Sequence, residues 1–297
     1  PENEQTIITL AGESGSGKTT TGKLLLRLHE RTAGEVLLEG KDIFSLEKSS
    51  LAALRRKIQI IYQDPYDALN PKKTIFRILS EPIEIHHLAK TDSERVDMVI
   101  QALEEVGLSP VEDFMPRYPY ELSGGQMQRV VVARTLLLKP ALIVADEPVS
   151  MLDVSIRAGI LRLMLDLRQK YGITFLFITH DLAVAKHVCD RITVMYLGKI
   201  FELASSEDLV HNPLHPYTQA LITAVPIPDP SVDRQSIKIK GEIPSAVNIP
   251  PGCRFHPRCP HAMEICSKIV PKLMSPDGSS QVEHLVACHL VNPVAEM

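Results

Sequence analysis

The sequence predicts an α/β fold: a parallel β-sheet with an inserted helical block and a small C-terminal extension rich in proline and cysteine. Apolar strands alternate with helical segments along the first two thirds of the 297 residues, and a glycine-rich loop joins the first strand to the first helix. Ten of the 22 prolines then lie between residues 205 and 260. Strands that are apolar throughout and separated by helices are typical of a parallel sheet covered on both faces.

The first strand and the first helix flank a phosphate-binding sequence. Residues 6–11 are apolar and β-branched, residues 19–28 follow a helical pattern, and the loop between them reads GESGSGKT, which fits G-x-x-x-x-G-K-[ST]. Glycines let the backbone turn its N–H groups toward an anion, and the helix N-terminus adds its dipole. The alternative is a chance Gly/Ser loop before a helix. We predict that nucleotide phosphates are bound by Gly12, Ser14, Gly15, Ser16, Gly17, Lys18, Thr19 and Thr20.

A helical block interrupts the sheet after the next strand. Residues 34–43 predict a hairpin that turns at Gly40, residues 51–57 predict a helix, and residues 58–62 predict a buried strand. From about 74 to 139 the pattern is mainly helical, with a capping box at Thr91 and a second helix over 123–138. We therefore place a helical subdomain at about 74–139.

The remaining strands complete the predicted sheet. Residues 141–145 and 174–179 predict buried strands, with an amphipathic helix around 156–167 between them. Residues 191–204 predict a closing hairpin around Gly198-Lys199, a pair that suits a type II′ turn. The change of composition near residue 205 divides the chain into a nucleotide-binding domain, 1–204, and a C-terminal extension, 205–297.

Four polar residues follow predicted strands directly, where α/β proteins gather ligands. Asp146 is predicted to hold Mg²⁺, and Glu147 to polarise an attacking water. Gln63 is a candidate ligand of Mg²⁺ and could also contact the attacking water. His180 is a candidate to hold the γ-phosphate. Each has a plainer alternative: the acids and Gln63 fit solvated turns, and a histidine at a strand end is commonly a hydrogen-bonded structural residue.

A pentapeptide at the start of the second helix connects these candidates. Its residues, Leu122-Ser123-Gly124-Gly125-Gln126, resemble the signature motif of ATP-binding-cassette (ABC) ATPases. The P-loop, Gln63, Asp146 with Glu147, residues 150–153 and His180 follow that family's motif order. The resemblance implies a P-loop NTPase fold of the ABC type, with ATP and Mg²⁺ as cofactors and with Glu147, His180 and Gln63 as catalytic residues. Mg²⁺ would be held by Thr19, Gln63 and Asp146, and the γ-phosphate on a second subunit would be capped by Ser123, Gly124, Gly125 and Gln126.

Further segments are similar to ATPase subunits of oligopeptide and dipeptide importers, namely residues 63–71, 211–218, 241–245 and 252–260. The resemblance implies a subunit that powers peptide import from the cytoplasmic face of the membrane as a peripheral protein. The implied partners are a second ATPase subunit, identical or not, two membrane-spanning permease subunits docked near residues 65–82, and indirectly an external solute-binding protein. No apolar run approaches the length of a membrane span, and a net charge of −4 disfavours a nucleic-acid surface. The family's adenine-stacking aromatic residue is absent from the residues before Gly12.

Four of the five cysteines cluster in the extension, at 253, 259, 266 and 288. The resemblance to the importers implies that Cys253, Cys259, Cys266 and Cys288 hold a structural [4Fe–4S] cluster. Zinc, with help from His256, His261 or His289, is an alternative, although the close C-x₂₋₄-C pair of structural zinc sites is missing. Unliganded thiols or disulfides are a third reading. Cys189 is expected to be a small buried hydrophobe.

Two other functions are compatible with parts of this pattern. One is a soluble iron–sulfur ABC ATPase that acts on ribosomes or nucleic acid, but the chain has a single cassette, no heptads and no basic stripe. The other is a metal or redox regulator that does not hydrolyse ATP, which the presence of Lys18, Glu147 and His180 disfavours.

Overall fold

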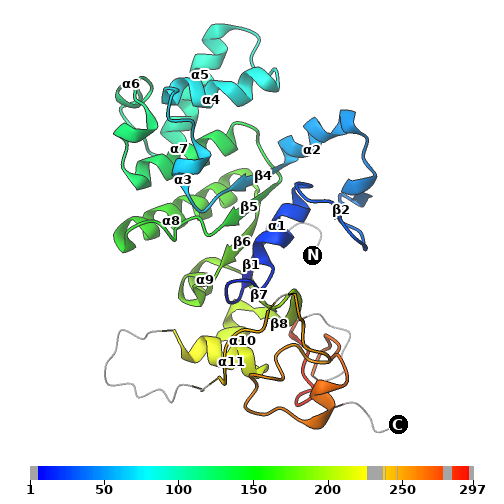
Figure 1. Ribbon diagram of the computed structural model, residues 1–297. Coiled ribbons are helices and arrows are strands. Elements are labelled where there is room, and N and C mark those ends of the chain that lie inside the picture. Colours follow the sequence, from blue (N-terminus) through cyan, green and yellow to red (C-terminus); the bar gives the residue numbers. More distant parts are fainter. Residues whose placement is uncertain (1–5, 226–236, 238, 246, 277–282, 294–297) are drawn as a thin grey trace. The chain divides into compact units, whose positions relative to one another are not determined.

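The computed structural model describes residues 6–225, 237, 239–245, 247–276 and 283–293. These residues form two compact units (Figure 1). The first unit comprises residues 22–176, and the second comprises residues 6–21 and the described residues from 177 onward. The chain passes from one unit to the other inside α1 (Lys18–Leu25) and again inside β6 (Thr174–Thr179). The predicted boundary near residue 205 falls where β8 meets α10, inside the second unit, and stays a prediction.

The first unit contains a parallel strand pair, β4 (Ile58–Ile61) and β5 (Leu142–Asp146), in which Ile58 lies opposite Leu142. The helix α2 (Leu51–Lys57) leads into β4, as predicted. The predicted hairpin is present as β2 (Leu37–Leu38) and β3 (Lys41–Asp42), and Gly40 turns it with φ of +74°. Short 3₁₀ turns occupy Ile43–Ser45, Lys48–Ser50 and Pro119–Glu121.

The segment between residues 74 and 139 is helical, as predicted, and three of its helices, α4, α5 and α7, begin at side-chain caps. The helices of this segment are α4 (Ile75–Ile85), α5 (Asp92–Glu105), α6 (Val111–Phe114) and α7 (Gly124–Leu136), and the short helix α3 (Pro65–Ala68) precedes it. The Thr91 hydroxyl accepts from the Glu94 N–H at 3.2 Å and so caps α5. The predicted capping box is incomplete, because the Glu94 carboxylate accepts from the N–H of Lys90 instead of Thr91. The core under these helices is aliphatic, with Ile78, Leu79, Val99, Leu103 and Val130 all buried.

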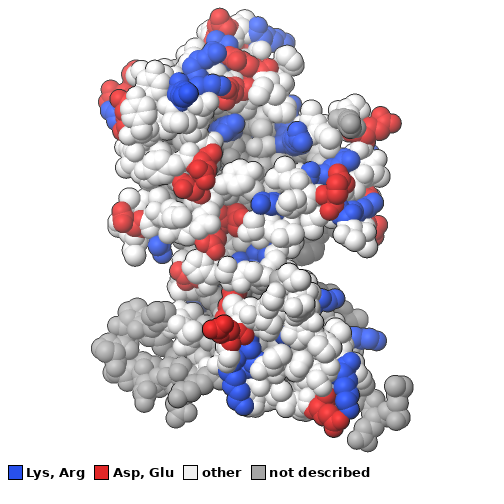
Figure 2. All heavy atoms as spheres, in the orientation of Figure 1, with Lys and Arg blue, Asp and Glu red and all other residues white. Residues whose placement is uncertain are grey.

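The surface of this helical block carries both signs of charge. On the face shown in Figure 2, Lys and Arg side chains are interspersed with Asp and Glu side chains over the first unit. Arg95 contacts Glu84 at 2.8 Å and Asp92 at 3.1 Å, and Arg77 lies 3.6 Å from the same Glu84. Such ion pairs at the protein surface add little stability, so the helices depend on their buried apolar faces.

The second unit is built on a four-strand arrangement around β7 (Arg191–Tyr196). β1 (Ile7–Ala11) runs parallel to β7, β8 (Lys199–Ser205) is antiparallel to β7, and β9 (Leu285–Val286) is antiparallel to β8. The helices α8 (Val154–Tyr171), in the first unit, and α9 (Leu182–Val188), in the second, flank β6 in the sequence. The extension supplies α10 (Ser206–His211), α11 (Pro216–Thr223) and a 3₁₀ turn over Glu264–Ser267.

The predicted type II′ turn of the β7–β8 hairpin is wrong. Tyr196 pairs with Lys199, so the turn consists of Leu197 and Gly198, whose φ angles are +44° and +76°. Positive φ at both central residues defines a type I′ turn, whereas type II′ needs it only at the first. The error arose because the sequence pattern centred the turn one residue too late.

An aromatic cluster in the core of the second unit joins the β7–β8 hairpin to the extension. Tyr196 packs against Phe201, Tyr217 and Phe255 with ring centroids 4.9 to 5.5 Å apart. His215 stacks on Phe201 at 4.5 Å, and its Nδ1 accepts from the N–H of Tyr217, which caps α11. Burial lowers the pKa of His215 to about 4, against a weaker opposing effect of Glu202. This histidine is therefore neutral in the folded protein at pH 7.

We predict an acid-sensitive contribution of His215 to stability. Because the folded pKa lies below the unfolded value of about 6.5, the unfolded chain takes up the proton first, and stability is lost as the pH falls from about 6.5 toward 4. Between pH 7 and pH 5 this group should remove about 2 kcal/mol of unfolding free energy. His215→Asn keeps a cap acceptor and should flatten that pH dependence in denaturant titrations, whereas exposed His29→Asn should not. An unchanged pH dependence in His215→Asn would contradict the assignment.

Candidate functional site

The phosphate-binding loop lies between β1 and α1 in the second unit and is shaped by one glycine in particular. Gly12 has φ of +151°, and a Cβ placed on it would lie 2.2 Å from the carbonyl oxygen of Met195 in β7. No other residue fits there without displacing the strand. Among the predicted phosphate-binding residues, Ser14, Gly15, Thr19 and Thr20 are exposed, while Gly12, Ser16 and Lys18 are buried.

Lys18 is folded back onto the loop. Its Nζ donates to the carbonyl oxygens of Gly12 at 2.7 Å and Glu13 at 3.0 Å, and to the Ser16 hydroxyl at 3.3 Å. An ammonium group surrounded by oxygens at the N-terminus of a helix is well placed to exchange these partners for phosphate oxygens. The loop thus holds the cation that the motif requires.

The carboxyl ends of β4 and β5 bring two predicted catalytic residues together in the first unit. Gln63 follows β4, and its Nε2 donates to Oε2 of Glu147, directly after β5, at 3.3 Å. Asp146 is the last residue of β5. Glu147 has φ of +48°, a left-handed conformation that costs energy for a residue with a side chain and is common at functional sites. The Ser150 hydroxyl donates to the Glu147 carbonyl at 3.0 Å and fixes this turn.

His180 is placed in the second unit, at the end of β6, and it is exposed. The residue after it, Asp181, caps α9 by accepting from the N–H groups of Ala183 and Val184 at 2.9 and 3.2 Å. The predicted site residues are therefore shared between the units: the phosphate-binding loop and His180 in one, and Gln63, Asp146 and Glu147 in the other.

The signature pentapeptide forms the N-terminus of α7 in the first unit. Ser123 caps the helix, with its hydroxyl accepting from the Gln126 N–H at 3.4 Å while Gln126 Oε1 accepts from the Ser123 N–H at 2.9 Å. A Cβ on Gly125 would lie 2.6 Å from Cγ2 of Ile156, so this glycine lets α7 approach α8 closely. Ser123 itself is exposed, and the positive end of the helix dipole lies beside it.

The four clustered cysteines converge on one narrow cavity. Cys253, Cys259, Cys266 and Cys288 all line it, together with His256, His261 and His289. Burial, with the neighbouring cysteines, raises the pKa of Cys253 to about 11, and burial also raises the pKa values of Cys259 and Cys288. Within the described residues, however, no group of three or more His, Cys, Asp or Glu side chains is arranged to hold a metal ion. Cys189 is buried, as predicted.

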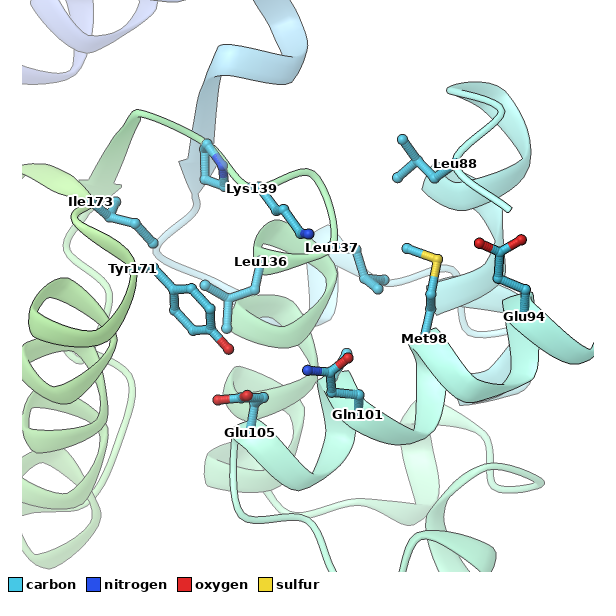
Figure 3. Close-up of a pocket in the computed structure, with 12 residues that line it drawn as sticks. Leu88, Glu94, Met98, Gln101, Glu105, Leu136, Leu137, Lys139, Tyr171 and Ile173 are labelled. Atoms are coloured by element: carbon cyan, nitrogen blue, oxygen red, sulfur yellow. The ribbon is translucent and has the colours of Figure 1, made fainter. Parts of the chain in front are cut away.

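A separate cavity of about 480 Å³ lies in the first unit between α5, the end of α7 and the end of α8 with the residues that follow it (Figure 3). Its wall is largely apolar, with Leu88, Met98 and Leu136 among its residues. Burial raises the pKa of Glu105 on its rim, but hydrogen bonds from Lys170 and Tyr171 outweigh this effect, and the net pKa lies below the ordinary value. No predicted site residue lines this cavity.

Comparison with known proteins identifies the family. The family profile described as ABC transporter matches residues 3–150, and the profile described as the C-terminal region of oligopeptide/dipeptide transporters matches residues 201–266. The chain is 49% identical, over 97% of its length and 80% of the relative's, to the probable peptide ABC transporter ATP-binding protein y4tS of Sinorhizobium fredii. It belongs to the ABC transporter ATP-binding proteins of the oligopeptide and dipeptide type.

Other similar proteins agree with this placement. The oligopeptide transport ATP-binding protein AppF of Bacillus subtilis is 48% identical over 95% of this ABC protein and 84% of its own length. The dimeric, post-hydrolysis structure of the ATP-binding cassette MJ0796 with ADP and Pi is 30% identical over 69% of the chain and 87% of its own, with a TM-score of 0.61. The fold is thus that of an ABC ATPase, and the chain is an ATPase of that family. The names of these relatives mention neither an iron–sulfur cluster nor zinc, and they give no support to a role on ribosomes.

Two features of this ABC ATPase were not predicted from its sequence. One is the reciprocal cap between Ser123 and Gln126, which the spacing S-x-x-Q signals. The other is an ion pair between Glu13, inside the phosphate-binding loop, and Arg258 in the extension, 2.6 Å apart. No sequence signal identifies that pair, since its members lie 245 positions apart in the chain.

We predict that Gly12→Ala impairs nucleotide binding far more than it impairs folding elsewhere. The new methyl group would meet the Met195 carbonyl and force the loop off β7, so affinity for a fluorescent ATP analogue should fall by at least about tenfold. Gly34→Ala is the matched control, because Gly34 also has positive φ, +83°, but a Cβ placed on it would have no atom within 4 Å. It should cost about 1 kcal/mol of stability and leave affinity intact. Equal affinity in both variants would contradict the geometry.

Proposed function

We propose that this protein binds and hydrolyses ATP to power the import of peptides through a membrane ABC transporter. One observation carries the proposal: the amide of Gln63 meets the carboxylate of Glu147 at the ends of two paired parallel strands. That places a water-orienting amide beside a potential general base. The relatives named as peptide or oligopeptide transport ATP-binding proteins supply the class of solute.

The proposed roles follow from the chemistry of each group. The N–H groups of the phosphate-binding loop and the ammonium of Lys18 hold the phosphates, and His180 contacts the γ-phosphate. Thr19, Gln63 and Asp146 supply oxygen ligands suited to Mg²⁺, which when bound neutralises charge on the phosphates. Glu147 accepts a proton from the attacking water, and Gln63 orients that water.

We further propose that the signature motif acts on ATP held by a second ATPase subunit. Ser123 is exposed at the N-terminus of α7, where its N–H groups and dipole favour an anion, yet it already caps its own helix. The dimeric cassette among the similar structures is consistent with two subunits. ATP held between two such subunits would join them, and hydrolysis would release them. The partner subunit is a copy of this chain or a related one.

The proposed contact with the permease subunits lies at α3 and the residues around it. Tyr62 and Tyr66 are 42% and 61% exposed, which is unusual for large aromatic side chains and typical of protein interfaces. The Arg134 guanidinium donates to the Ala68 carbonyl at 3.0 Å and ties α3 to α7. A permease helix at α3 would thus act on the helix that carries the signature motif.

The proposed location is the cytoplasmic face of the membrane, held there by two permease subunits, with the solute-binding protein acting only through them. Across the described residues, no helix has the length and apolar character needed to cross a bilayer. The interspersed charges in Figure 2 and the net charge of −4 favour protein partners over nucleic acid.

We also propose a [4Fe–4S] cluster on Cys253, Cys259, Cys266 and Cys288, with zinc as the alternative. The donor chemistry supports it, because four thiols line one cavity, although these side chains are not arranged as a ready-made metal site. The cluster would cross-link a segment with few apolar residues, and binding it would require Cys253, whose pKa burial raises, to lose its proton.

We predict that Glu147→Gln abolishes turnover while preserving ATP binding. Removing the base should lower the rate of ATP hydrolysis by about 10²- to 10⁴-fold, and the ATP-bound dimer should accumulate in sedimentation experiments. Exposed Glu112→Gln in α6 makes the same change away from the strands and should leave turnover unchanged. Normal hydrolysis by Glu147→Gln would refute the role assigned to Glu147.

Metal analysis of protein purified without oxygen tests the thiol site. We expect about four irons and four sulfides per chain, and Cys266→Ser should lose them while an intact fold persists in circular dichroism. One zinc per chain without sulfide would establish the zinc alternative. Protein without either metal would refute both.

A further inference from the structure

The backbone and side chain of Glu13 connect the phosphate-binding loop to the C-terminal extension. Its N–H donates to the hydroxyl of Tyr217 in α11 at 2.9 Å, and its carbonyl oxygen accepts from Lys18 Nζ at 3.0 Å. Its carboxylate is bound by Arg258. One residue therefore touches both the cation of the loop and two elements of the extension.

The contact between Arg258 and Glu13 has the geometry of a strong, specific ion pair. The two terminal nitrogens of the guanidinium donate to the two carboxylate oxygens at 2.6 and 3.2 Å. The Arg258 side chain is only 9% exposed, lies over the ring of Tyr196 at 5.8 Å and donates to the Tyr196 hydroxyl. Paired donors on both oxygens fix the orientation of a carboxylate, which a single flexible ammonium does not do.

Burying the charged Arg258 side chain costs free energy, so stabilising the fold is a poor explanation for this residue. Its Nε is buried and has no hydrogen-bond partner among the described residues. Buried ion pairs are often no more stable than apolar replacements, whereas removing one partner leaves a buried charge uncompensated. An arginine in this arrangement holds its partner in one place more effectively than it stabilises the fold.

The segment of residues 254–258, which includes Arg258, is connected to the phosphate-binding loop at a second point. Arg254 donates to the carbonyl of Leu197 in the β7–β8 turn, and the N–H of Gly198 in that turn donates to the Ser16 carbonyl at 2.7 Å. Phe255, between the two arginines, is fully buried against Tyr196 and Tyr217 and anchors the segment. Residues 254–258 thus contact the phosphate-binding loop directly at Glu13 and indirectly at Ser16, through the β7–β8 turn.

We propose that Arg258 is a positioning residue for ATP binding: by holding Glu13, it keeps the phosphate-binding loop and Lys18 in the conformation that accepts the phosphates. Arg258 acts through Glu13 and does not itself contact the nucleotide. The inference rests on the proposed binding of ATP at this loop and adds a determinant of its affinity that lies in the extension.

Titration of a fluorescent ATP analogue into the full-length chain tests this role. Arg258→Met and Glu13→Gln should each raise the dissociation constant by about tenfold, and the double variant should be no weaker than the worse single one. Arg258→Lys, which keeps the charge but loses the paired donors, should fall between Arg258→Met and the wild type. In steady-state hydrolysis the Michaelis constant for ATP should rise by a similar factor, while the rate at saturating ATP should change less than twofold.

Controls separate positioning from general damage. Lys268→Met removes an exposed cation from the same extension, where Lys268 pairs with Glu264, and should leave ATP affinity unchanged. The double variant Glu13→Arg with Arg258→Glu, which exchanges the two charges, should recover part of the ATP affinity that Arg258→Glu alone loses. The inference would be overturned, and the proposed function left standing, if folded Arg258→Met and Arg258→Lys proteins bound ATP with wild-type affinity. Additive effects in the double variant would overturn it in the same way. A wild-type chain that binds no nucleotide would instead overturn the proposed function.

Discussion

The close approach of the phosphate-binding loop to β7 is the constraint on which the nucleotide chemistry depends. Gly12 must lack a side chain because the Met195 carbonyl occupies that space, and the loop that follows must then curve around Lys18. Successive N–H groups in such a loop form an anion-binding concavity, and residues outside the loop also contact it. Here the surroundings are the β7–β8 turn and the aromatic cluster, to which Tyr217 and Tyr196 belong.

The first unit depends on a comparable close approach. Gly125 lets α7 lie against Ile156 of α8, and residues 150–153, which precede α8, are held by Arg157, which donates to the carbonyls of Leu152 and Ser150. The signature motif, α8 and the turn at Glu147 therefore form one packed group. Arg134 connects α3 to α7, so α3 is linked through α7 to the residues proposed to act on ATP.

Much of the fold and of the candidate site was predictable from local sequence patterns. The strands, the phosphate-binding loop and the Ser123 helix start have sequence signals because each depends on neighbours within a few residues, and Gln63 and Glu147 were predicted to meet because parallel strands share an edge. The Leu197-Gly198 turn was misplaced because a non-glycine residue with positive φ has no clear signal. The Glu13–Arg258 pair was missed because it depends on how the extension packs, which no local pattern encodes. The convergence of the four cysteines was predicted from their clustering, whereas a metal on them remains a proposal.

The most direct test of the account is the dependence of specific ATPase activity on the concentration of the purified chain. If ATP is hydrolysed only between two subunits, activity per chain should rise with concentration over about a hundredfold range and then level off as dimers saturate. Glu147→Gln should sediment as an ATP-dependent dimer over the same range. Appreciable activity that stays constant per chain down to the lowest concentration would show that one subunit suffices, and would contradict the role assigned to Ser123 and the signature motif.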